Sequence, residues 1–313
     1  MGKRSRSVTK PQRLNRGDTI GIVAPASAFD AENFKRGVSM LKKLGYRVKY
    51  ERTIFNSCWS KPGHDQQRGL QINRMFADPE VKAIFCAKAG YGSVEIIPYL
   101  DKGVIRRNPK IFVGYSDITV LLLYLQKISN MVVFHGPVVS DEIYEEMNQV
   151  TLDYLLRTLS HALPLGPIMF PHLVSFKPGK ATGTLVGGNL SLIAGSIGTP
   201  YKIATSGAIL FLEDIAEDLE NIKKYLLRLR RAGKFKKIKG VLLGMMVDCF
   251  EAQGNLKILI NDIFKNRDIP ILFGFPSGHT DKRGAPHVTL PLGVTATLDA
   301  DNLHLHISEE AVV

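Results

Sequence analysis

The stretch KIFVGYSDIT, residues 110–119, decides the fold because a β-type run passes directly into a helical one. The apolar run Lys110–Val113 predicts a strand, and apolar residues repeating at helical spacing over Ile118–Ile128 predict a helix. A strand joined to a helix by so short a turn is typical of a βα unit in a parallel sheet. The same alternation runs from Asp18 to Val133. The first half is therefore expected to be α/β, with its sheet buried on both faces.

Working outward, the other strands expected in this sheet are Thr19–Val23, Tyr46–Tyr50, Val81–Ala87 and Met131–Phe134. A helix is expected between the first two, with Asp30 as its N-cap and Gly45 just past its end. Apolar spacing predicts further helices around Leu70–Phe76 and over Val94–Leu100.

After His135 the alternation of β-type and helical runs is interrupted, which predicts a second domain. Residues 141–178 hold one expected helix, Val150–Leu159, and are otherwise punctuated by proline and glycine, as in a connection. The expected strands that follow are Thr182–Val186, Ala208–Leu212, Gly240–Met245, Ile271–Phe273, Val294–Leu298 and Leu303–Ile307, and the expected helices are Leu219–Arg231 and Leu256–Lys265. The last two strands flank a short turn, so this sheet is at least partly antiparallel. We expect a basic tail (1–17), an N-terminal α/β domain (18–140), the connection (141–178) and a C-terminal domain (179–313).

Composition narrows the class of protein. The 313 residues are 45% hydrophobic and 22% charged, which excludes a disordered or collagen-like chain and favours two domains. Three distant cysteines, Cys58, Cys86 and Cys249, cannot form a disulfide framework or a CxxC site and fit a reducing compartment. The basic N-terminus lacks the apolar segment of a signal peptide, and no apolar run reaches the roughly 20 residues of a membrane span. We expect a cytoplasmic protein with no membrane partner.

The formal net charge is +12, with basic residues gathered in residues 3–16 and 223–239. Neither cluster has interleaved aromatics, zinc-finger spacing or a basic-zipper pattern, so no specific nucleic-acid binding is expected. We interpret them as a disordered tail and a solvated helix face. No HExxH-like block is present, and His304 and His306 are interpreted as the polar face of a strand. Neither a metal nor another cofactor is expected.

Ser116 is the first candidate catalytic residue, because it lies at the expected strand-to-helix turn. Such a turn can hold a hydroxyl out from the carboxyl edge of the sheet, beside the free N–H groups of the helix start. This geometry suits a nucleophile with an oxyanion site. The alternative is that Ser116 only caps the helix.

Gly90 and Gly92 surround Tyr91 directly after the strand Val81–Ala87. Glycines there let the backbone approach a ligand closely, and ligands bind at the carboxyl edge of a parallel sheet. An ordinary tight turn is the alternative. The spacing matches neither GxGxxG nor a P-loop, so nucleotide binding is not predicted.

A serine nucleophile needs a base and an acid, and the second half offers both. Glu213 and Asp214 follow the strand Ala208–Leu212, and His279 lies in a loop after Ile271–Phe273. Taken alone, Glu213 is better explained as a charge at a helix N-terminus, and His279 as a surface or packing histidine. Nothing in their spacing establishes that they meet.

Together, several segments resemble one family, the bacterial LD-carboxypeptidases, which include muramoyltetrapeptide carboxypeptidases and microcin C self-immunity peptidases. The resemblance covers nearly the whole chain after the tail. It rests on GDTIGIVAPAS (17–27), AGYG (89–92), FVGYSDIT (112–119), HGP (135–137), GTLVGGNL (183–190), LFLED (210–214), and GH (278–279) followed by LPLG (290–293).

The resemblance implies that Ser116 is the nucleophile, Glu213 the orienting acid and His279 the general base. It further implies that the backbone N–H groups of Gly90 and Asp117 hold the oxyanion. The implied architecture is a flavodoxin-like, class I glutamine-amidotransferase-like domain joined to a C-terminal β-rich α/β domain, with the site in the cleft between them, in a homodimer. Glu217 is a competing acid.

One departure from the family pattern is Lys88-Ala89, where similar sequences often have Arg-Gly. Lysine keeps the charge but loses the planar fork that grips a carboxylate, so specificity is expected to be affected rather than the triad.

The implied reaction is serine-type hydrolysis of the L,D-amide bond that releases terminal D-Ala from a cytoplasmic murein tetrapeptide, as in peptidoglycan recycling. One alternative is a microcin C-type self-immunity peptidase that cleaves an aminoacyl-nucleotide antibiotic. The alternative of another class is a non-catalytic peptide-binding protein on the same fold.

Overall fold

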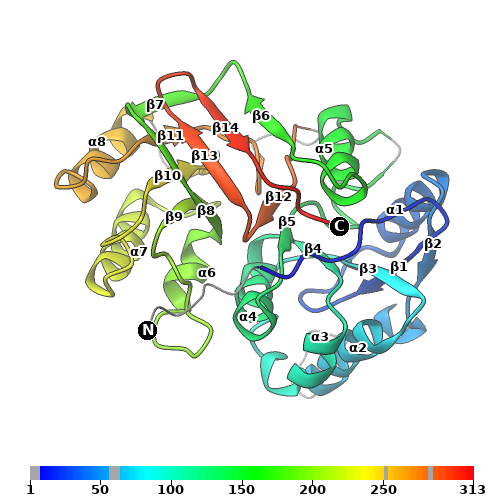
Figure 1. The fold of residues 1–313 in the computed structure, drawn as a ribbon. Coiled ribbons are helices and arrows are strands. Elements are labelled where there is room, and N and C mark those ends of the chain that lie inside the picture. The colour runs from blue at the N-terminus through cyan, green and yellow to red at the C-terminus, as the bar shows by residue number, and fades with distance from the viewer. Residues whose placement is uncertain (1–7, 56–63, 145, 250–252, 281–284) are drawn as a thin grey trace, which may run out of the picture.

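The computed structural model describes residues 8–55, 64–144, 146–249, 253–280 and 285–313. Two β-sheets, each with its own helices, lie side by side (Figure 1). One sheet is built mainly from the first half of the chain and the other from the second half. The expected two-part α/β architecture is confirmed.

The first sheet has six strands in the order β12-β5-β4-β3-β1-β2. Five of them are parallel: β1 (Thr19–Val23), β2 (Arg47–Lys49), β3 (Val81–Cys86), β4 (Ile111–Gly114) and β5 (Val133–His135). Their order, 2-1-3-4-5, is that of the flavodoxin-like fold, whose ligands bind beyond the carboxyl ends of the strands.

The helices of this half are α1 (Ala31–Lys43), α2 (Asp65–Ala77), α3 (Lys102–Arg107), α4 (Thr119–Ser129) and α5 (Gln149–Ser160). Short 3₁₀ turns occupy Arg52–Phe55, Ile97–Tyr99 and Ser116–Ile118. In α1, the Asp30 side chain accepts a hydrogen bond from the backbone of Asn33, and Phe34, Val38 and Leu41 form the buried face. The helix therefore begins and ends where its cap and apolar spacing predict.

The second sheet has eight strands in the order β6-β14-β13-β8-β9-β10-β11-β7. A parallel centre, from β8 (Lys180–Asn189) through β9 (Ala208–Glu213) and β10 (Gly240–Leu243) to β11 (Ile271–Phe273), is flanked by antiparallel strands. The flanking strands are β6 (Gly166–Met169), β7 (Val174–Lys177), β13 (Thr295–Asp299) and β14 (His304–Ile307). The predicted hairpin is present as the antiparallel pair β13 and β14.

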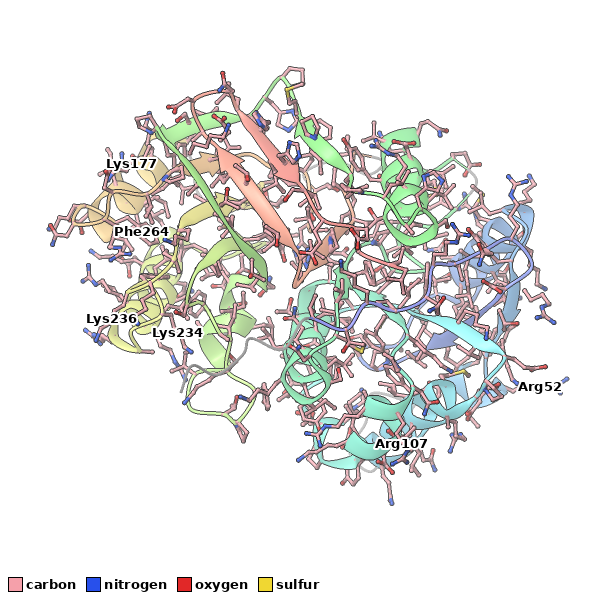
Figure 2. All side chains as sticks on the ribbon, in the orientation of Figure 1. Arg52, Arg107, Lys177, Lys234, Lys236 and Phe264 are labelled. Carbon is pink, nitrogen blue, oxygen red and sulfur yellow. The ribbon has the colours of Figure 1, made fainter. Side chains whose placement is uncertain are left out.

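Three helices accompany this sheet: α6 (Leu190–Gly195), α7 (Leu219–Arg231) and α8 (Gln253–Ile263). In α7, Ile222, Leu226 and Leu229 are buried, whereas its basic residues are exposed. Lys236, in the segment after α7, lies at the periphery in Figure 2 and is exposed. The solvated helix face expected for part of the cluster 223–239 is confirmed.

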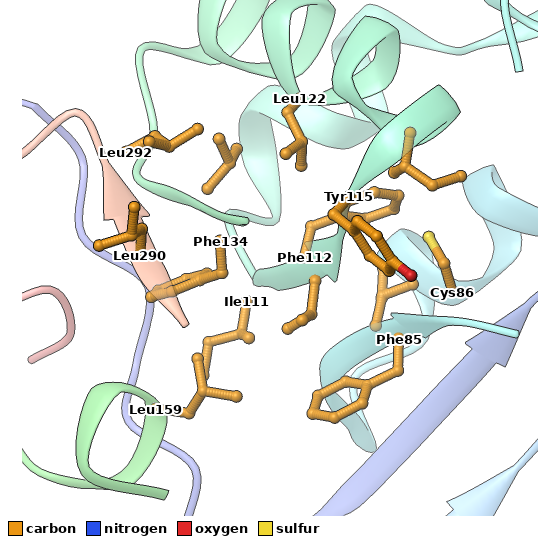
Figure 3. Packing of buried hydrophobic residues seen from close by; sticks show 14 of the residues in the cluster. Phe85, Cys86, Ile111, Phe112, Tyr115, Leu122, Phe134, Leu159, Leu290 and Leu292 are labelled. Atoms are coloured by element: carbon orange, nitrogen blue, oxygen red, sulfur yellow. The ribbon is translucent and has the colours of Figure 1, made fainter. Parts of the chain in front are cut away.

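Strand β12 (Leu290–Leu292) links the two halves, because it lies late in the chain yet pairs antiparallel with β5 of the first sheet. In Figure 3, Leu290 and Leu292 pack in the same buried cluster as Phe134 and Leu159. That cluster also contains residues of the second sheet, such as Phe211. One continuous apolar core therefore joins the two sheets.

Several expectations were wrong. Val94–Leu100 is not an α-helix: it consists of turns and one short 3₁₀ helix, Ile97–Tyr99. Pro98, within that 3₁₀ helix, lacks a backbone N–H donor. The stretch 141–178 is more than a connection, because β6 and β7 form the two edges of the second sheet. The sequence did not predict strand β12 or helices α3 and α6.

The expectation of a disordered tail was wrong for residues 8–17. The backbone of Thr9 hydrogen-bonds with Asn130 and Val132, and Arg13 N–H donates to Val313. Leu14 is buried, and Lys10 pairs with Glu309 and Glu310. The remainder of the basic tail, residues 1–7, lies outside the described residues. Within the described parts of the chain, no helix is long and apolar enough to cross a membrane.

Candidate active site

Ser116 stands on a sharp turn between β4 and α4. Its φ is +58°, in the left-handed region that residues other than glycine rarely adopt. The turn is tight, because a Cβ on Gly114 would lie 2.8 Å from the Ile118 side chain. Ser116 sits inside the 3₁₀ turn instead of at its cap, and no side chain caps either this turn or α4. The helix-cap alternative for Ser116 is therefore wrong, and the conformation observed is a strained strand-to-helix elbow, which is compatible with a nucleophile.

The loop containing Gly90 is hydrogen-bonded to the elbow. Ser93 donates its backbone N–H to the Asp117 carboxylate at 2.8 Å and its hydroxyl to the Asp117 carbonyl at 2.6 Å. Gly90 has φ +110°, and a Cβ there would lie 2.3 Å from Ser27 Oγ. The positive φ and this close approach both favour glycine, as a ligand-binding loop and an ordinary tight turn alike predict.

A buried arginine, unnoticed in the sequence, supports the same loops. Arg68 is 1% exposed and donates to the carbonyls of Pro25, Ala26 and Gly92, and it pairs with Asp65. One side chain thus ties together the loops after β1 and β3, at the switch point where flavodoxin-like sheets bind ligands.

Glu213 and His279 form a direct pair, although 66 residues separate them. His279 Nδ1 lies 2.7 Å from Glu213 Oε2, and the His279 backbone N–H donates to the same oxygen at 3.2 Å. A Cβ on Gly278 would lie 2.5 Å from the Glu213 carboxyl carbon, so glycine is required there. The competing acid Glu217 accepts instead from the Tyr225 hydroxyl, at 2.9 Å.

The electrostatics of the pair favour an orienting acid and a base. Burial alone would raise the pKa of Glu213, but the charge and hydrogen bonds of His279 outweigh it and lower that pKa. Burial would lower the pKa of His279, and Glu213 outweighs it and raises that pKa. A proton held on Nδ1 by the carboxylate leaves Nε2 free as an acceptor.

Two contacts join Ser116's neighbours to this pair. The Tyr115 ring lies 5.1 Å from the His279 ring, centroid to centroid. The backbone N–H of Asn189, which pairs with Glu213 in the second sheet, donates to Thr119 Oγ1 at 3.1 Å. The serine elbow and the Glu213–His279 pair therefore lie on the same side of the junction between the sheets.

Sequence reasoning missed a polar cluster beside this pair. The Tyr115 hydroxyl donates to Glu142, which also accepts from the Val138 backbone N–H at 2.9 Å. His135 and His287 are buried, and none of their ring nitrogens has a hydrogen-bond partner among the described residues. Burial lowers the pKa of His135 to about 4 and that of His287 well below its usual value. The motif containing His135 was noticed, but nothing local marks Glu142 or His287.

Cavities and acid clusters elsewhere do not compete as the catalytic centre. A cavity of about 740 Å³ lies between α4, β8 and the N-terminal segment, and it is lined by none of the candidate catalytic residues. In the described ranges, no three His, Cys, Asp or Glu side chains group as metal ligands.

Lys88, at the departure from the family pattern, lies 3.8 Å from Asp141, with both side chains about one-third exposed.

Known proteins match this chain in both halves. Residues 20–136 match the LD-carboxypeptidase N-terminal domain, and residues 182–298 match the LD-carboxypeptidase C-terminal domain. A probable murein peptide carboxypeptidase of Bacillus subtilis is 35% identical, with 93% of this chain and 91% of the relative aligned.

Solved structures agree with the sequence matches. An MccF-like protein from Bacillus anthracis has a TM-score of 0.86 and 28% identity, covering 96% of this chain and 99% of the other. A muramoyltetrapeptide carboxypeptidase from Oxalobacter formigenes has a TM-score of 0.79 and 28% identity, covering 93% and 99%. With both domains matched, this chain belongs to the LD-carboxypeptidase family and is a serine-type hydrolase.

Proposed function

We propose that this hydrolase releases terminal D-Ala from a cytoplasmic murein tetrapeptide by cleaving the amide between its L-configured centre and the D-residue. The observation that carries the proposal is the 2.7 Å contact between the buried Glu213 and the partly buried His279, whose ring packs against the residue that precedes Ser116. Relatives named as murein peptide carboxypeptidases support the choice of substrate.

In the proposed mechanism, His279 Nε2 takes the proton of Ser116 as its oxygen attacks the scissile carbonyl. Glu213 stabilises the imidazolium that forms. His279 then protonates the leaving amine of D-Ala, which breaks the amide and leaves an acyl ester on Ser116. Water, deprotonated by His279, hydrolyses this ester and restores the serine.

Two backbone N–H groups, those of Gly90 and Asp117, are proposed to hold the oxyanion. Support comes from the hydrogen bonds of Ser93 to Asp117, which tie the Gly90 loop to the serine elbow. Donors in such a hole each lower the barrier by about 3 kcal/mol.

The test combines labelling with turnover. A fluorophosphonate should modify Ser116, detected by peptide mass spectrometry, and the protein should release D-Ala from murein tetrapeptide. Both signals should vanish in Ser116→Ala and His279→Ala and persist in Glu217→Gln, the acid that binds Tyr225 instead. Folded protein that neither labels nor releases D-Ala would instead favour a peptide-binding role.

A second candidate, cleavage of an aminoacyl-nucleotide antibiotic, is favoured by the likeness to an MccF-like protein. The sequence carries a single tryptophan, Trp59, so no indole in the second half is available to stack on a nucleobase. Hydrolysis of an aminoacyl sulfamoyl adenosine is the discriminating assay. A higher kcat/KM there than on tetrapeptide would replace the murein proposal.

A further inference from the structure

Tyr115 lies between the candidate nucleophile and the candidate base. It directly precedes Ser116, just after β4, and its side chain is buried (Figure 3). Its ring meets the His279 ring at 5.1 Å, centroid to centroid, with 64° between the two planes. Aromatic rings favour such edge-to-face contacts. Tyr115 thus contacts the base through its side chain and is joined to the nucleophile through its backbone.

The Tyr115 hydroxyl is anchored by a carboxylate. It donates to Glu142, whose second oxygen accepts the Val138 backbone N–H at 2.9 Å. The loop before Glu142 is itself bonded to the sheet, because the Ser140 backbone N–H and hydroxyl donate to the Ala87 carbonyl at 2.9 and 2.8 Å. Burial and the charge of Glu142 hold the pKa of Tyr115 well above its ordinary value, so the hydroxyl keeps the proton that it donates.

A second buried ring packs on Tyr115. The His287 ring lies 4.8 Å from it, with 80° between the planes, and His287 is 1% exposed. The His287 backbone N–H donates to Thr151 Oγ1 at 2.9 Å, which restrains its backbone. Burial holds the pKa of His287 well below its ordinary value, so its ring is neutral and adds no charge beside the base. The position of the Tyr115 ring is therefore defined by contacts other than the one with His279.

The hydrogen bonds of His279 do not by themselves define the plane of its ring. Both go to Glu213 Oε2, one from the backbone N–H and one from Nδ1. A hydrogen bond to one ring nitrogen restrains that atom but leaves the plane of the ring to be set by packing. The plane matters, because it decides where Nε2 points, and a misplacement of about 1 Å can cost about 10²-fold in rate.

We propose that Tyr115, anchored by Glu142, is a positioning residue that holds the plane of the His279 imidazole for proton transfer with Ser116. The inference rests on the roles proposed for Ser116 and His279 and deepens them. Neither Tyr115 nor Glu142 makes or breaks a bond in that mechanism. The hydroxyl acts by holding the ring in place, so losing the ring should cost more than losing the hydroxyl.

The first test removes either the ring or its hydroxyl. Tyr115→Leu should lower kcat for D-Ala release about 10²-fold, the cost of a base misplaced by about 1 Å. Tyr115→Phe keeps the ring without its anchor and should lower kcat about tenfold, the scale of one hydrogen bond. KM should change little in both, because the loss falls on the reaction step and not on substrate binding. An unchanged kcat in both folded variants would overturn the proposal, and so would a loss confined to KM.

The second test addresses the anchor. Glu142→Leu removes the acceptor and should lower kcat as far as Tyr115→Phe does, and the double variant should be no slower than either, because both remove the same bond. Additive losses would overturn the anchoring role. Tyr225→Phe is the matched control, since it breaks a comparable bond to Glu217, at 2.9 Å, and its ring makes no contact with His279 in the described structure. This control should keep its kcat.

The rate of Ser116 labelling by a fluorophosphonate separates this inference from the proposed substrate, because labelling needs the base but no murein peptide. Labelling should slow in Tyr115→Leu as kcat does. Slow labelling there, with no D-Ala release by the unmodified protein, would support the positioning role and refute the proposed substrate. Normal labelling and normal D-Ala release in folded Tyr115→Leu would overturn the positioning role and leave the proposed function standing. If circular dichroism shows that Tyr115→Leu does not fold, Tyr115→Phe decides by the same measurements.

Discussion

Replacing Glu213 with glutamine isolates the charge of the candidate acid. Both hydrogen bonds from His279 go to the same oxygen, Oε2, whereas Oε1 has no hydrogen-bond partner within the described ranges. A glutamine can therefore place its single carbonyl oxygen at the Oε2 position and keep both bonds. The amide N–H groups then take the buried Oε1 position, where no acceptor is present among the described residues, so the free energy of unfolding should fall by about 1–3 kcal/mol while the fold is retained. In folded protein, the change in rate reports the lost charge.

The size of the effect follows from the burial of the pair. Glu213 is 1% exposed in its side chain, so solvent screens its attraction to the imidazolium only weakly. A hydrogen bond to a charged acceptor contributes up to about 3 kcal/mol, so removing the charge while keeping the bond costs at most about that much, or roughly 10²-fold in rate. Serine triads whose acid becomes an amide lose about 10⁴-fold, because the imidazole also adopts the wrong tautomer. We expect kcat/KM for D-Ala release to fall between these limits.

The pH profile distinguishes this cause from a general loss of structure. Glu213 raises the pKa of His279, and the histidine must be neutral to act as a base. The ascending acidic limb of kcat/KM should therefore move to lower pH in Glu213→Gln and stay in place in Glu217→Gln. A limb that stays or moves to higher pH, in a variant that is folded, would refute the role assigned to Glu213.

Three further substitutions test the surroundings of the site. Gly278 has φ +90°, and a Cβ there would lie 2.5 Å from the Glu213 carboxyl carbon. Gly278→Ala should therefore lower the free energy of unfolding in urea by about 1–3 kcal/mol and impair D-Ala release. Full activity would contradict the required close approach. Thr119→Val leaves the Asn189 N–H unpaired and should lower the free energy of unfolding in urea by about 1–3 kcal/mol. An unchanged free energy of unfolding would show that this hydrogen bond is dispensable. Burial holds the pKa of His135 at about 4 in the folded protein, below its usual 6.5, so the unfolded chain binds a proton more readily. As the pH is lowered from 6.5 to 4, the free energy of unfolding should therefore fall by up to about 1.4 kcal/mol per pH unit. His135→Phe should reduce the dependence of the unfolding free energy on pH, measured by urea unfolding at a series of pH values. An equally steep dependence would argue against the lowered pKa of His135.

Elements with strong local signals were predictable from the sequence. The bounds expected for the helix Leu219–Arg231 are those observed, because its buried residues repeat at helical spacing and Asp218 caps it. Strand β12 was missed for the opposite reason. It has three residues with a proline among them, and it is stabilised by β5, more than 150 positions earlier in the chain. Pairing over such a distance leaves no local pattern.

The candidate site likewise has residues that the sequence marks and contacts that only the tertiary fold creates. Ser116 follows β4, Glu213 is the last residue of β9, and His279 lies in the loop after β11, so sequence marks them as residues at a sheet edge. The 2.7 Å contact between the acid and the base depends on the tertiary fold, and only the resemblance pointed to it. Glu142 and His287 carry no motif at all, because their importance lies in which polar atoms burial brings together.

The Glu213–His279 pair is better explained by chemistry than by stability. Pairing seldom repays the desolvation of a buried charge; the Glu213 side chain is 1% exposed, that of His279 is 14% exposed, and one carboxylate oxygen finds no partner in the described structure. Two glycines also make room for it, since a Cβ on Gly244 would lie 2.6 Å from Glu213 Cβ and one on Gly278 would meet the carboxyl group. Glycines lose more backbone entropy on folding than other residues. These costs are intelligible if the acid holds a base in a fixed orientation for the Ser116 reaction, because fixed dipoles need no reorganisation when charge develops.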